Sequence, residues 1–381
     1  MNQTEQILLQ IIKKSLWNTD CIISEEIDWN AVLKEAEEQA ILGIAARAVP
    51  KEIQKQWGKS ITGVTRNYIR ILFAEKNLVE LFQQNEIPLA ILKGTAASVY
   101  YPVPSSRSMG DIDCVVPKDC FDESKRLLLN NGYVFVSEHS ENRHAGFSKD
   151  GISIELHYHF SYNDIDVESY IEDGMSGIEL HTVDGIAFPM LPKLANGLVL
   201  LAHMMHHLKT ALGLRQAIDW MMYVNSVLDD VFWDTAFKSA ADQTGLTTAA
   251  VTATRMCQIY LGLSDRIEWC KDADPELCRG LMDSMLSSGN FGTKLESGAS
   301  VERVSARLRE EGFFSHLQKA GEKNWRAYHK HKWLKPIAWI YPACLYAKKG
   351  LRINHSGSKI IADIKRGKQR TDLYQKMINK Q

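Results

Sequence analysis

The sequence predicts an α+β fold in which a mixed sheet with flanking helices lies between helical regions at both ends of the chain. Three observations predict it. Apolar residues recur at helical spacing over residues 1–86 and again from Pro192 onward. Between these regions, short apolar runs alternate with helical segments, as expected for a mixed sheet. One run ends in Asp150-Gly151, a dipeptide typical of β-hairpin turns.

Three helices are predicted in the N-terminal region. The first carries an apolar stripe, the second can be capped by Asp28, and the third runs from about Val64 to Gln84. The stripe of the first helix consists of Ile7, Leu8, Ile11, Ile12 and Leu16.

Strands and helices are predicted in alternation in the central region. The strands are "IPLAIL", "DIDCVV", "YVFVSEH" and "ISIELHYHF", while "TAASVYY" begins a helix and "CFDESKRLLLNN" forms another before Gly132. Because side chains alternate along a strand, Asp111 and Asp113 project from one face of "DIDCVV". Ile112 and Cys114 then project from the other. Two neighbouring like charges are costly to bury, so we expect a cation between the aspartates.

Four regions are expected along the chain. They are an N-terminal helical region (1–86), the domain that contains the sheet (87–191), a helical domain (192–310) and a basic helical tail (311–381). Residues 331–381 hold 12 Lys or Arg against 2 Asp or Glu. Such a helix can lie on an anionic membrane surface or touch nucleic acid, but a solvated helix face is the favoured interpretation.

The composition is that of an ordinary globular protein. The net charge of −1 gives no global field that would attract nucleic acid or a membrane. Seven scattered cysteines without a CxxC pair indicate reduced thiols rather than a disulfide framework. The N-terminus lacks the pattern of a signal peptide, and the longest apolar stretch is shorter than the ~20 residues that span a bilayer. The expected location is cytoplasmic.

Three features of the central region share one chemistry. Lys93-Gly94-Thr95 lies at a strand-to-helix junction, where backbone N–H groups can receive a phosphate. Asp111 and Asp113 form an acidic pair on the next predicted strand, and a third carboxylate, that of Glu155, lies on a later one. Carboxylates on neighbouring strands can hold Mg²⁺, which prefers oxygen ligands and often bridges to phosphates. Two such ions can act in an in-line displacement.

The segment from Ile91 to Phe160 resembles the nucleotidyltransferase superfamily typified by DNA polymerase beta. More narrowly, "LKG…YYP…R…GDIDCVV…IELHYHF", followed by "LLAHMMHHLKTALGLRQAIDW", is similar to an uncharacterised bacterial nucleotidyltransferase family of that superfamily. The resemblance implies transfer of a nucleoside monophosphate from a nucleoside triphosphate to an acceptor hydroxyl, with release of pyrophosphate. The acceptor (a sugar, another small molecule, a protein or an RNA end) is not indicated.

The resemblance also implies roles for individual residues. Gly94 and Thr95 would bind phosphate, Asp111 and Asp113 would hold metal ions, and Glu155 would be the third carboxylate. This chain has Gly-Thr where the superfamily more often has Gly-Ser, and the threonine keeps the hydroxyl group. A glutamate in place of the third aspartate reaches one methylene further and could act as a general base.

Charged neighbours of these residues are further candidates. Arg107 and Lys93 flank the predicted site and could neutralise a triphosphate. Arg215 and Asp219 lie four residues apart on a predicted helix. In the family that the chain resembles, such a pair follows the catalytic domain. The two residues could therefore close the cleft from the helical side or form a structural ion pair.

Two alternative functions remain open. The histidine pairs His157/His159 and His203/His207 could bind zinc and form a hydrolase, with the second pair also facing the cleft. Histidines hydrogen-bonded within a core are the competing interpretation. The chain could also be a catalytically silent protein that binds a nucleotide or a partner on the same fold.

Overall fold

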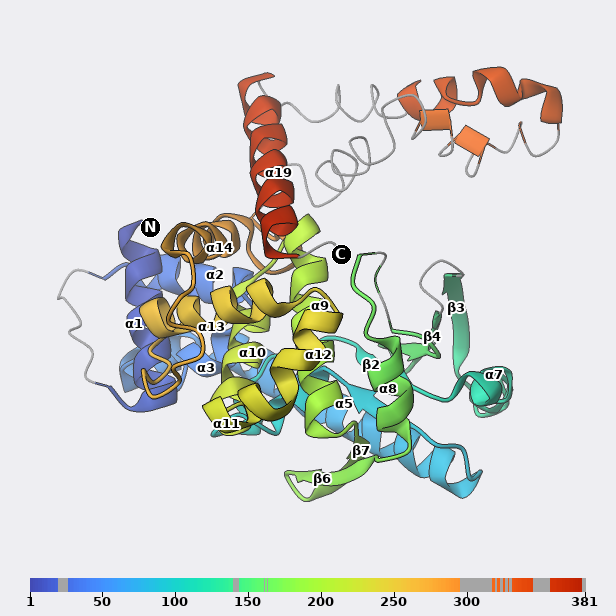
Figure 1. Cartoon of the computed structure of the whole chain (residues 1–381), viewed down its shortest axis with the longest axis horizontal. Coiled ribbons are helices and arrows are strands. Elements are labelled where there is room, and N and C mark those ends of the chain that lie inside the picture. Colours follow the sequence, from blue (N-terminus) through green and yellow to red (C-terminus); the bar gives the residue numbers. More distant parts are fainter. Residues whose placement is uncertain are drawn as a thin grey trace.

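The computed structural model describes residues 1–19, 27–139, 144–160, 162, 164–294, 331–344 and 357–378, together with residues 317, 318, 321, 322, 325 and 328. A central sheet is covered by helices from both halves of the chain (Figure 1). The predicted α+β class is therefore confirmed. The boundaries of the four expected regions stay predictions.

The sheet has seven strands in the order β3-β4-β5-β2-β1-β7-β6. Strand β2 pairs in parallel with β5, and β1 in parallel with β7, while the other neighbours are antiparallel. The sheet is thus mixed, as the sequence predicts. The strands are β1 (Ala90–Leu92), β2 (Ile112–Val115), β3 (Val134–His139), β4 (His144–Lys149), β5 (Ile152–His157), β6 (Glu179–Val183) and β7 (Ile186–Met190).

The two faces of strand β2 have different environments. Ile112 and Cys114 are fully buried in a cluster with apolar side chains of helices α5 (Gly58–Gln84) and α7 (Phe121–Asn130). Asp113 points to the opposite face, where it lines a pocket. The alternation predicted from "DIDCVV" is therefore correct, and it leaves the aspartates on the face that α5 and α7 do not cover.

The hairpin β4–β5 turns at Asp150-Gly151, as predicted, with positive φ at both residues. A second hairpin, β6–β7, turns at Asp184-Gly185 in the same way and was not predicted. It extends the sheet beyond β1 through the pairing of Ile91 with Met190.

The helices before and after the sheet form one core. Trp17 Nε1 donates to Leu261 O at 2.7 Å, and Gln39 Nε2 donates to Met285 O at 3.1 Å. Gln39 Oε1 accepts from the backbone N–H of Leu214 at 3.0 Å. The further helices are α1 (Gln3–Trp17), α2 (Trp29–Glu38), α3 (Leu42–Ala45), α4 (Lys51–Gln56), α6 (Gly94–Ser98), α8 (Glu168–Met175), α9 (Lys193–Thr210), α10 (Leu214–Ser226), α11 (Asp230–Phe232), α12 (Lys238–Gln243), α13 (Thr247–Leu261), α14 (Pro275–Ser288) and α19 (Gly357–Met377).

The predicted helix starts are largely correct. Asp28 caps α2, because its Oδ1 accepts from the N–H groups of Asn30 and Ala31 at 3.0 Å. Helix α5 begins at Gly58, six residues before the predicted start near Val64. The short helices α3 and α4, which precede it, were not predicted.

Helices α9 and α10 pack closely against each other. A Cβ atom on Gly197 of α9 would lie 2.3 Å from the ring of Tyr223 on α10. A glycine inside a helix normally weakens it, so this one is explained by the close approach. The contact fixes α10 next to α9 on the pocket side of the sheet.

The last helix of the basic tail rests on the body of the protein. Helix α19 contacts α9, α13 and α14 (Figure 1). It buries Tyr374 and Met377 while Lys368 and Lys376 stay exposed. The tail helix is thus amphipathic, with one solvated face. None of the helices in the described part of the chain has the length and apolar character that a bilayer crossing requires.

Candidate functional site

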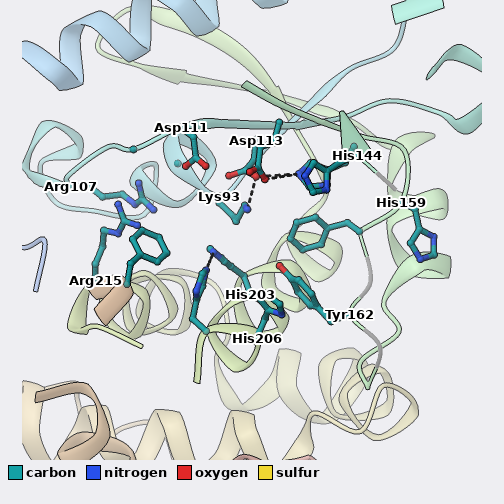
Figure 2. Close-up of a pocket in the computed structure, with 17 residues that line it drawn as sticks. Lys93, Arg107, Asp111, Asp113, His144, His159, Tyr162, His203, His206 and Arg215 are labelled. Carbon is teal, nitrogen blue, oxygen red and sulfur yellow. Dashed lines mark hydrogen bonds and ion pairs between the residues drawn. The ribbon is translucent and has the colours of Figure 1, made fainter. Parts of the chain in front are cut away.

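A pocket of about 290 Å³ lies between the exposed face of the sheet and helices α9 and α10. Figure 2 shows Asp111 and Asp113 on one side of it, His203, His206 and Tyr162 opposite, and Lys93 between them. Most of the predicted site residues line this pocket: Lys93, Gly94, Arg107, Asp111, Asp113, Glu155, His157, His159, His203, His207 and Arg215. Thr95 and Asp219 do not.

Asp113 and Glu155 are brought together by strand pairing. They are direct partners in the parallel register of β2 with β5. His157, two residues along β5, projects from the same face, and its Nε2 donates to Asp113 Oδ1 at 3.2 Å. The same nitrogen lies 3.6 Å from Glu155 Oε2. The sheet therefore concentrates two carboxylates and one imidazole at one point.

Ligand atoms of Asp113, Glu155 and His157 all lie within 4.8 Å of one another, close enough for all three to contact one metal ion. Carboxylate oxygens and an imidazole nitrogen suit a divalent cation, so the residues present fit such an ion. Asp111 is exposed at the mouth of the pocket and lies outside this group. The sequence predicted both aspartates and Glu155 as metal ligands, but it did not assign His157 to the same group.

The charges in this group affect one another. The neighbouring imidazole of His157 lowers the pKa of Glu155 to about 2, despite the partial burial of that carboxylate. Burial alone would lower the pKa of His157, but its hydrogen bond with Asp113 and the nearby carboxylate of Glu155 raise it above the ordinary value. Repulsion from Asp113, together with the partial loss of hydration at the pocket mouth, raises the pKa of Asp111.

Lys93 supplies the positive charge that the aspartate pair was predicted to need. Its ammonium group lies 2.6 Å from Asp113 Oδ1 and over the ring of Phe160, 5.1 Å from the centroid. Only 8% of the residue is exposed. Burial alone would lower the pKa of Lys93, but the carboxylates around it, Asp113 foremost, raise it.

The backbone of this turn is strained. Lys93 has φ 52° and ψ −131°, and Gly94 has φ 25°. Residues other than glycine rarely adopt a positive φ, and backbone strain of this kind is often found at functional sites. The turn directs the Lys93 ammonium toward Asp113.

The hydroxyl of Thr95 forms a hydrogen bond with Glu75, a residue that the sequence did not indicate as part of the site. The hydroxyl donates to Glu75 Oε2 on α5, and Thr95 is fully buried. Glu75 is 2% exposed, and its other oxygen accepts no hydrogen bond from any residue that the structure describes. Burial raises the pKa of Glu75 to about 7, against the lowering effect of the Thr95 hydrogen bond. In this structure the Thr95 hydroxyl, which was predicted to bind phosphate, therefore anchors the Lys93-Gly94 turn to helix α5 through Glu75.

Arg107 is also engaged by a buried acid. Its Nε and Nη2 donate to the two carboxylate oxygens of Asp219, each at 2.7 Å. Tyr101 Oη donates to Asp219 Oδ1 at 2.7 Å. Asp219 thus pairs with Arg107 and not, as the spacing suggested, with Arg215. Arg107 still reaches the pocket wall, but its charge is balanced.

Arg215 has no comparable partner. Its Nη1 donates to Ser108 O at 3.3 Å, and its buried Nε finds no hydrogen-bond partner in the part of the chain that the structure describes. The guanidinium carbon lies 5.3 Å from the centroid of the Phe291 ring. Burial lowers the pKa of Arg215.

Histidines form the helical wall of the pocket. His203 Nε2 and His207 Nε2 share a hydrogen bond of 2.9 Å, and His206 stacks on Tyr162 with ring centroids 4.0 Å apart. Burial lowers the pKa of His203 well below its ordinary value and that of His206 to about 4. His203 and His206 are therefore neutral near pH 7.

The zinc interpretation finds little support in this arrangement. His159 Nδ1 contacts Glu168 Oε2 at 3.0 Å rather than His157. In the described part of the chain, the group of three candidate metal ligands contains His157 but neither His159, His203 nor His207.

Several residues of the pocket were not predicted. They come from strand β4, from the segments that precede β2 and follow β5, from helices α5 and α9, and from the turn after α14. They are Gly110, His144, Phe160, Tyr162, His206 and Phe291, with Glu75 behind the turn. Three of them lie beside residues that the sequence did single out: Gly110 precedes Asp111, Phe160 follows His159, and His206 stands between His203 and His207.

Comparisons with known proteins match this part of the chain. A family model described as an uncharacterised nucleotidyltransferase matches residues 25–262, which include the whole sheet and helices α9 and α10. No curated protein matches the chain. Among solved structures, an antigenic nucleotidyltransferase-like protein from Paracoccidioides brasiliensis is similar, with 12% identity and a TM-score of 0.32 over 51% of this chain and 93% of that one. A likeness this remote carries no argument about activity.

Proposed function

Because the chain belongs to the uncharacterised nucleotidyltransferase family, we propose that it transfers a nucleoside monophosphate from a nucleoside triphosphate to an acceptor hydroxyl. The acceptor oxygen bonds to the α-phosphorus, the bond from that phosphorus to the bridging oxygen breaks, and pyrophosphate leaves. The hydroxyl proton passes to solvent or to a carboxylate. The observation that carries the proposal is the pairing of Asp113 with Glu155 beneath the Lys93-Gly94 turn.

Asp113, Glu155 and His157 would hold a divalent metal ion, Mg²⁺ in the first instance. A bound ion would neutralise charge on the phosphates during the displacement. Asp111 would supply a further carboxylate at the mouth of the pocket if a second ion is bound. We assign Glu155 to metal binding rather than to base catalysis because its oxygen belongs to the three-ligand group.

Lys93 and Gly94 would face the phosphates. The Lys93 ammonium already lies among the carboxylates, so it can exchange Asp113 for a phosphate oxygen without a large movement. The space beside Gly94 is free for a phosphate group, because the nearest atom to a Cβ built there would be Glu75 Oε1 at 3.7 Å. Thr95 would hold this turn through Glu75 rather than contact phosphate itself.

The acceptor would lie against the histidine wall. His203, His206 and Tyr162 face the carboxylates across the pocket (Figure 2). Neutral imidazoles both donate and accept hydrogen bonds, which suits a hydroxylated acceptor. Positioning of the acceptor and charge neutralisation of the phosphates would then account for most of the rate enhancement.

The proposal is tested by calorimetric titration of ATP, CTP, GTP and UTP with and without Mg²⁺, combined with an assay for released pyrophosphate. Asp113→Asn should abolish metal-dependent binding. Asp122→Asn, which makes the same chemical change at an exposed position of α7, should leave it intact. If no nucleoside triphosphate binds in the presence of Mg²⁺ or Mn²⁺, the proposal is wrong.

One observation favours a second candidate, a nucleotide-binding protein without turnover. Lys93 makes a 2.6 Å ion pair with the central carboxylate of the metal group. A protein that keeps this pair would bind a nucleotide without activating it. Tight metal-independent nucleotide binding with no pyrophosphate released, whatever acceptor is supplied, would favour this function over transfer.

A further inference from the structure

The pocket holds one arginine, Arg215, that makes no close ion pair with any carboxylate in the described part of the chain, although Asp219 and Asp111 act on its charge from further away. Of the lysine and arginine side chains that line it, Lys93 pairs with Asp113 and Arg107 with Asp219. Among the residues that the structure describes, no Asp or Glu oxygen lies within 4.0 Å of a nitrogen of Arg215. Arg215 is nevertheless buried, with only 8% of the residue exposed to solvent.

The surroundings of Arg215 offer it little compensation. One long hydrogen bond reaches Ser108 O at 3.3 Å, and the ring of Phe291 lies on one side. The Nε donor is buried and has no hydrogen-bond partner among the described residues. A buried charge that lacks a counter-charge and a buried donor that lacks an acceptor both oppose folding. Folding alone therefore does not explain the position of this side chain.

The guanidinium group lies next to the acidic part of the site. A Cβ atom on Gly110 would lie 3.8 Å from Arg215 Nη1, so the side chain covers the backbone that precedes Asp111. Figure 2 shows Arg215 and Arg107 together at one end of the pocket, with His159 at the other. An anion that extends from the metal group toward this end reaches Arg215.

We propose that Arg215, and not Arg107, is the guanidinium that binds the phosphate groups, so that it holds the pyrophosphate portion of the nucleotide. Arg107 is poorly placed for a bidentate contact with phosphate. Asp219 occupies the Nε and Nη2 donors of Arg107, and the remaining Nη1 donates to Ser108 O at 3.4 Å and to Met109 Sδ at 3.3 Å. The choice of pyrophosphate as the anion rests on the proposed function, whereas the anion site itself rests on the buried guanidinium of Arg215, which makes no ion pair with a described residue.

The test is calorimetric titration of inorganic pyrophosphate into the full chain, with and without Mg²⁺, for the wild type and for Arg215→Met. Methionine keeps most of the side-chain length but removes the charge. We expect the affinity for pyrophosphate to fall at least tenfold. We also expect the midpoint of thermal unfolding to stay the same or to rise, because the variant removes a buried charge that forms no close ion pair with a described residue. A purely structural arginine would give the reverse pair of results.

Two further variants serve as controls. Arg279→Met removes the same charge from an exposed position on α14, so it should leave pyrophosphate binding unchanged. Arg215→Lys keeps the charge but loses the fork, so it should bind pyrophosphate less tightly than the wild type and more tightly than Arg215→Met. The inference is overturned if the wild type does not bind pyrophosphate under either condition. It is also overturned if Arg215→Met, or Arg215→Lys should the methionine variant not fold, binds pyrophosphate as the wild type does.

The outcomes separate this inference from the proposed function. Pyrophosphate binding that depends on Arg215 in a protein without transfer activity would leave the anion site standing and reject the transferase. Transfer activity with the same KM for the nucleoside triphosphate in Arg215→Met would reject the anion site and leave the transferase standing.

Discussion

Asp219 accepts both of its guanidinium hydrogen bonds from Arg107, which lies 112 residues earlier in the chain, although Arg215 stands one helical turn away on the same helix. The bidentate pair links the loop before β2 to helix α10. It therefore fixes the distance between the sheet and the helical wall of the pocket. It also determines which of the two arginines is left for a ligand.

Arg107→Met should lower the free energy of unfolding by about 3–5 kcal/mol, because it leaves the carboxylate of Asp219 buried without its counter-charge. Urea unfolding of the wild type and the variant measures this difference. The double variant Arg107→Met/Asp219→Leu should recover part of the loss, since it removes both charges. A stability change below about 1 kcal/mol in the single variant, the size of an exposed ion pair, would contradict the structural role assigned to the pair.

Glu75→Gln should flatten the pH dependence of stability. The pKa of Glu75 is raised to about 7 in the folded protein from 4.5, so between these values the folded state keeps a proton that the unfolded state releases. The contribution of Glu75 to the free energy of unfolding of the wild type therefore falls as pH rises from 4.5 to 7. The contribution of this one group is at most about 3 kcal/mol.

Urea unfolding at pH 5 and at pH 8 tests this prediction for Glu75. Glu80→Gln, at an exposed position of the same helix, provides the control and should keep the wild-type difference between the two pH values. Equal pH dependence in the wild type and in Glu75→Gln would show that the Glu75 carboxyl does not titrate in this range.

His157→Gln should change which metal the site prefers. The imidazole nitrogen favours transition-metal ions such as Mn²⁺ over Mg²⁺, whereas the amide oxygen of glutamine does not. We expect the affinity for Mn²⁺ to fall roughly tenfold or more, and that for Mg²⁺ to change less. Titration of each ion, followed for Mn²⁺ by electron paramagnetic resonance, measures both. His181→Gln, at a histidine of β6 outside the pocket, is the control. An equal loss for the two ions would argue against His157 as a ligand.

Lys93→Met should strengthen metal binding in the absence of nucleotide. The Lys93 ammonium is paired with Asp113 and repels a second cation, so its removal should raise the affinity for Mn²⁺ on the order of tenfold. The affinity for a metal–nucleotide complex should fall, because the same ammonium group is proposed to bind phosphate. Lys76→Met, at a partly exposed position of α5, should change neither. Weaker Mn²⁺ binding in Lys93→Met would contradict the competition between lysine and metal.

Local patterns predicted much of the sheet and the acidic centre of the site. The alternation in "DIDCVV" placed Asp113 opposite the buried face of β2, and the Asp150-Gly151 turn located the hairpin that carries Glu155. Asp184-Gly185 carries the same turn signal, yet its hairpin was missed. Pro189 lies within β7, and Leu180 of β6 is 67% exposed, so neither strand has the apolar alternation that marks the others.

The tertiary contacts of the site could not be predicted in this way. Glu75 sits in a helix where a glutamate is ordinary, and only the folded chain brings it under Thr95. The spacing of Arg215 and Asp219 indicated a local pair, but a bidentate geometry with Arg107 is stronger than a contact between neighbours on one helix. The sequence could assign charged residues to helices and strands, but it could not predict which of them form ion pairs in the folded protein.

The union of the N-terminal and C-terminal helices in one core determines when the pocket can exist during synthesis. Gln39 holds the first turn of α10 and the end of α14, and Phe291, just beyond α14, lines the pocket. The strands that carry the carboxylates leave the ribosome long before these residues do. Because chains are made at about 5–20 residues per second, several seconds pass between the synthesis of the strands with the carboxylates and that of Phe291. Until then, the nascent protein lacks the full set of groups from α9, α10 and Phe291 that completes the site.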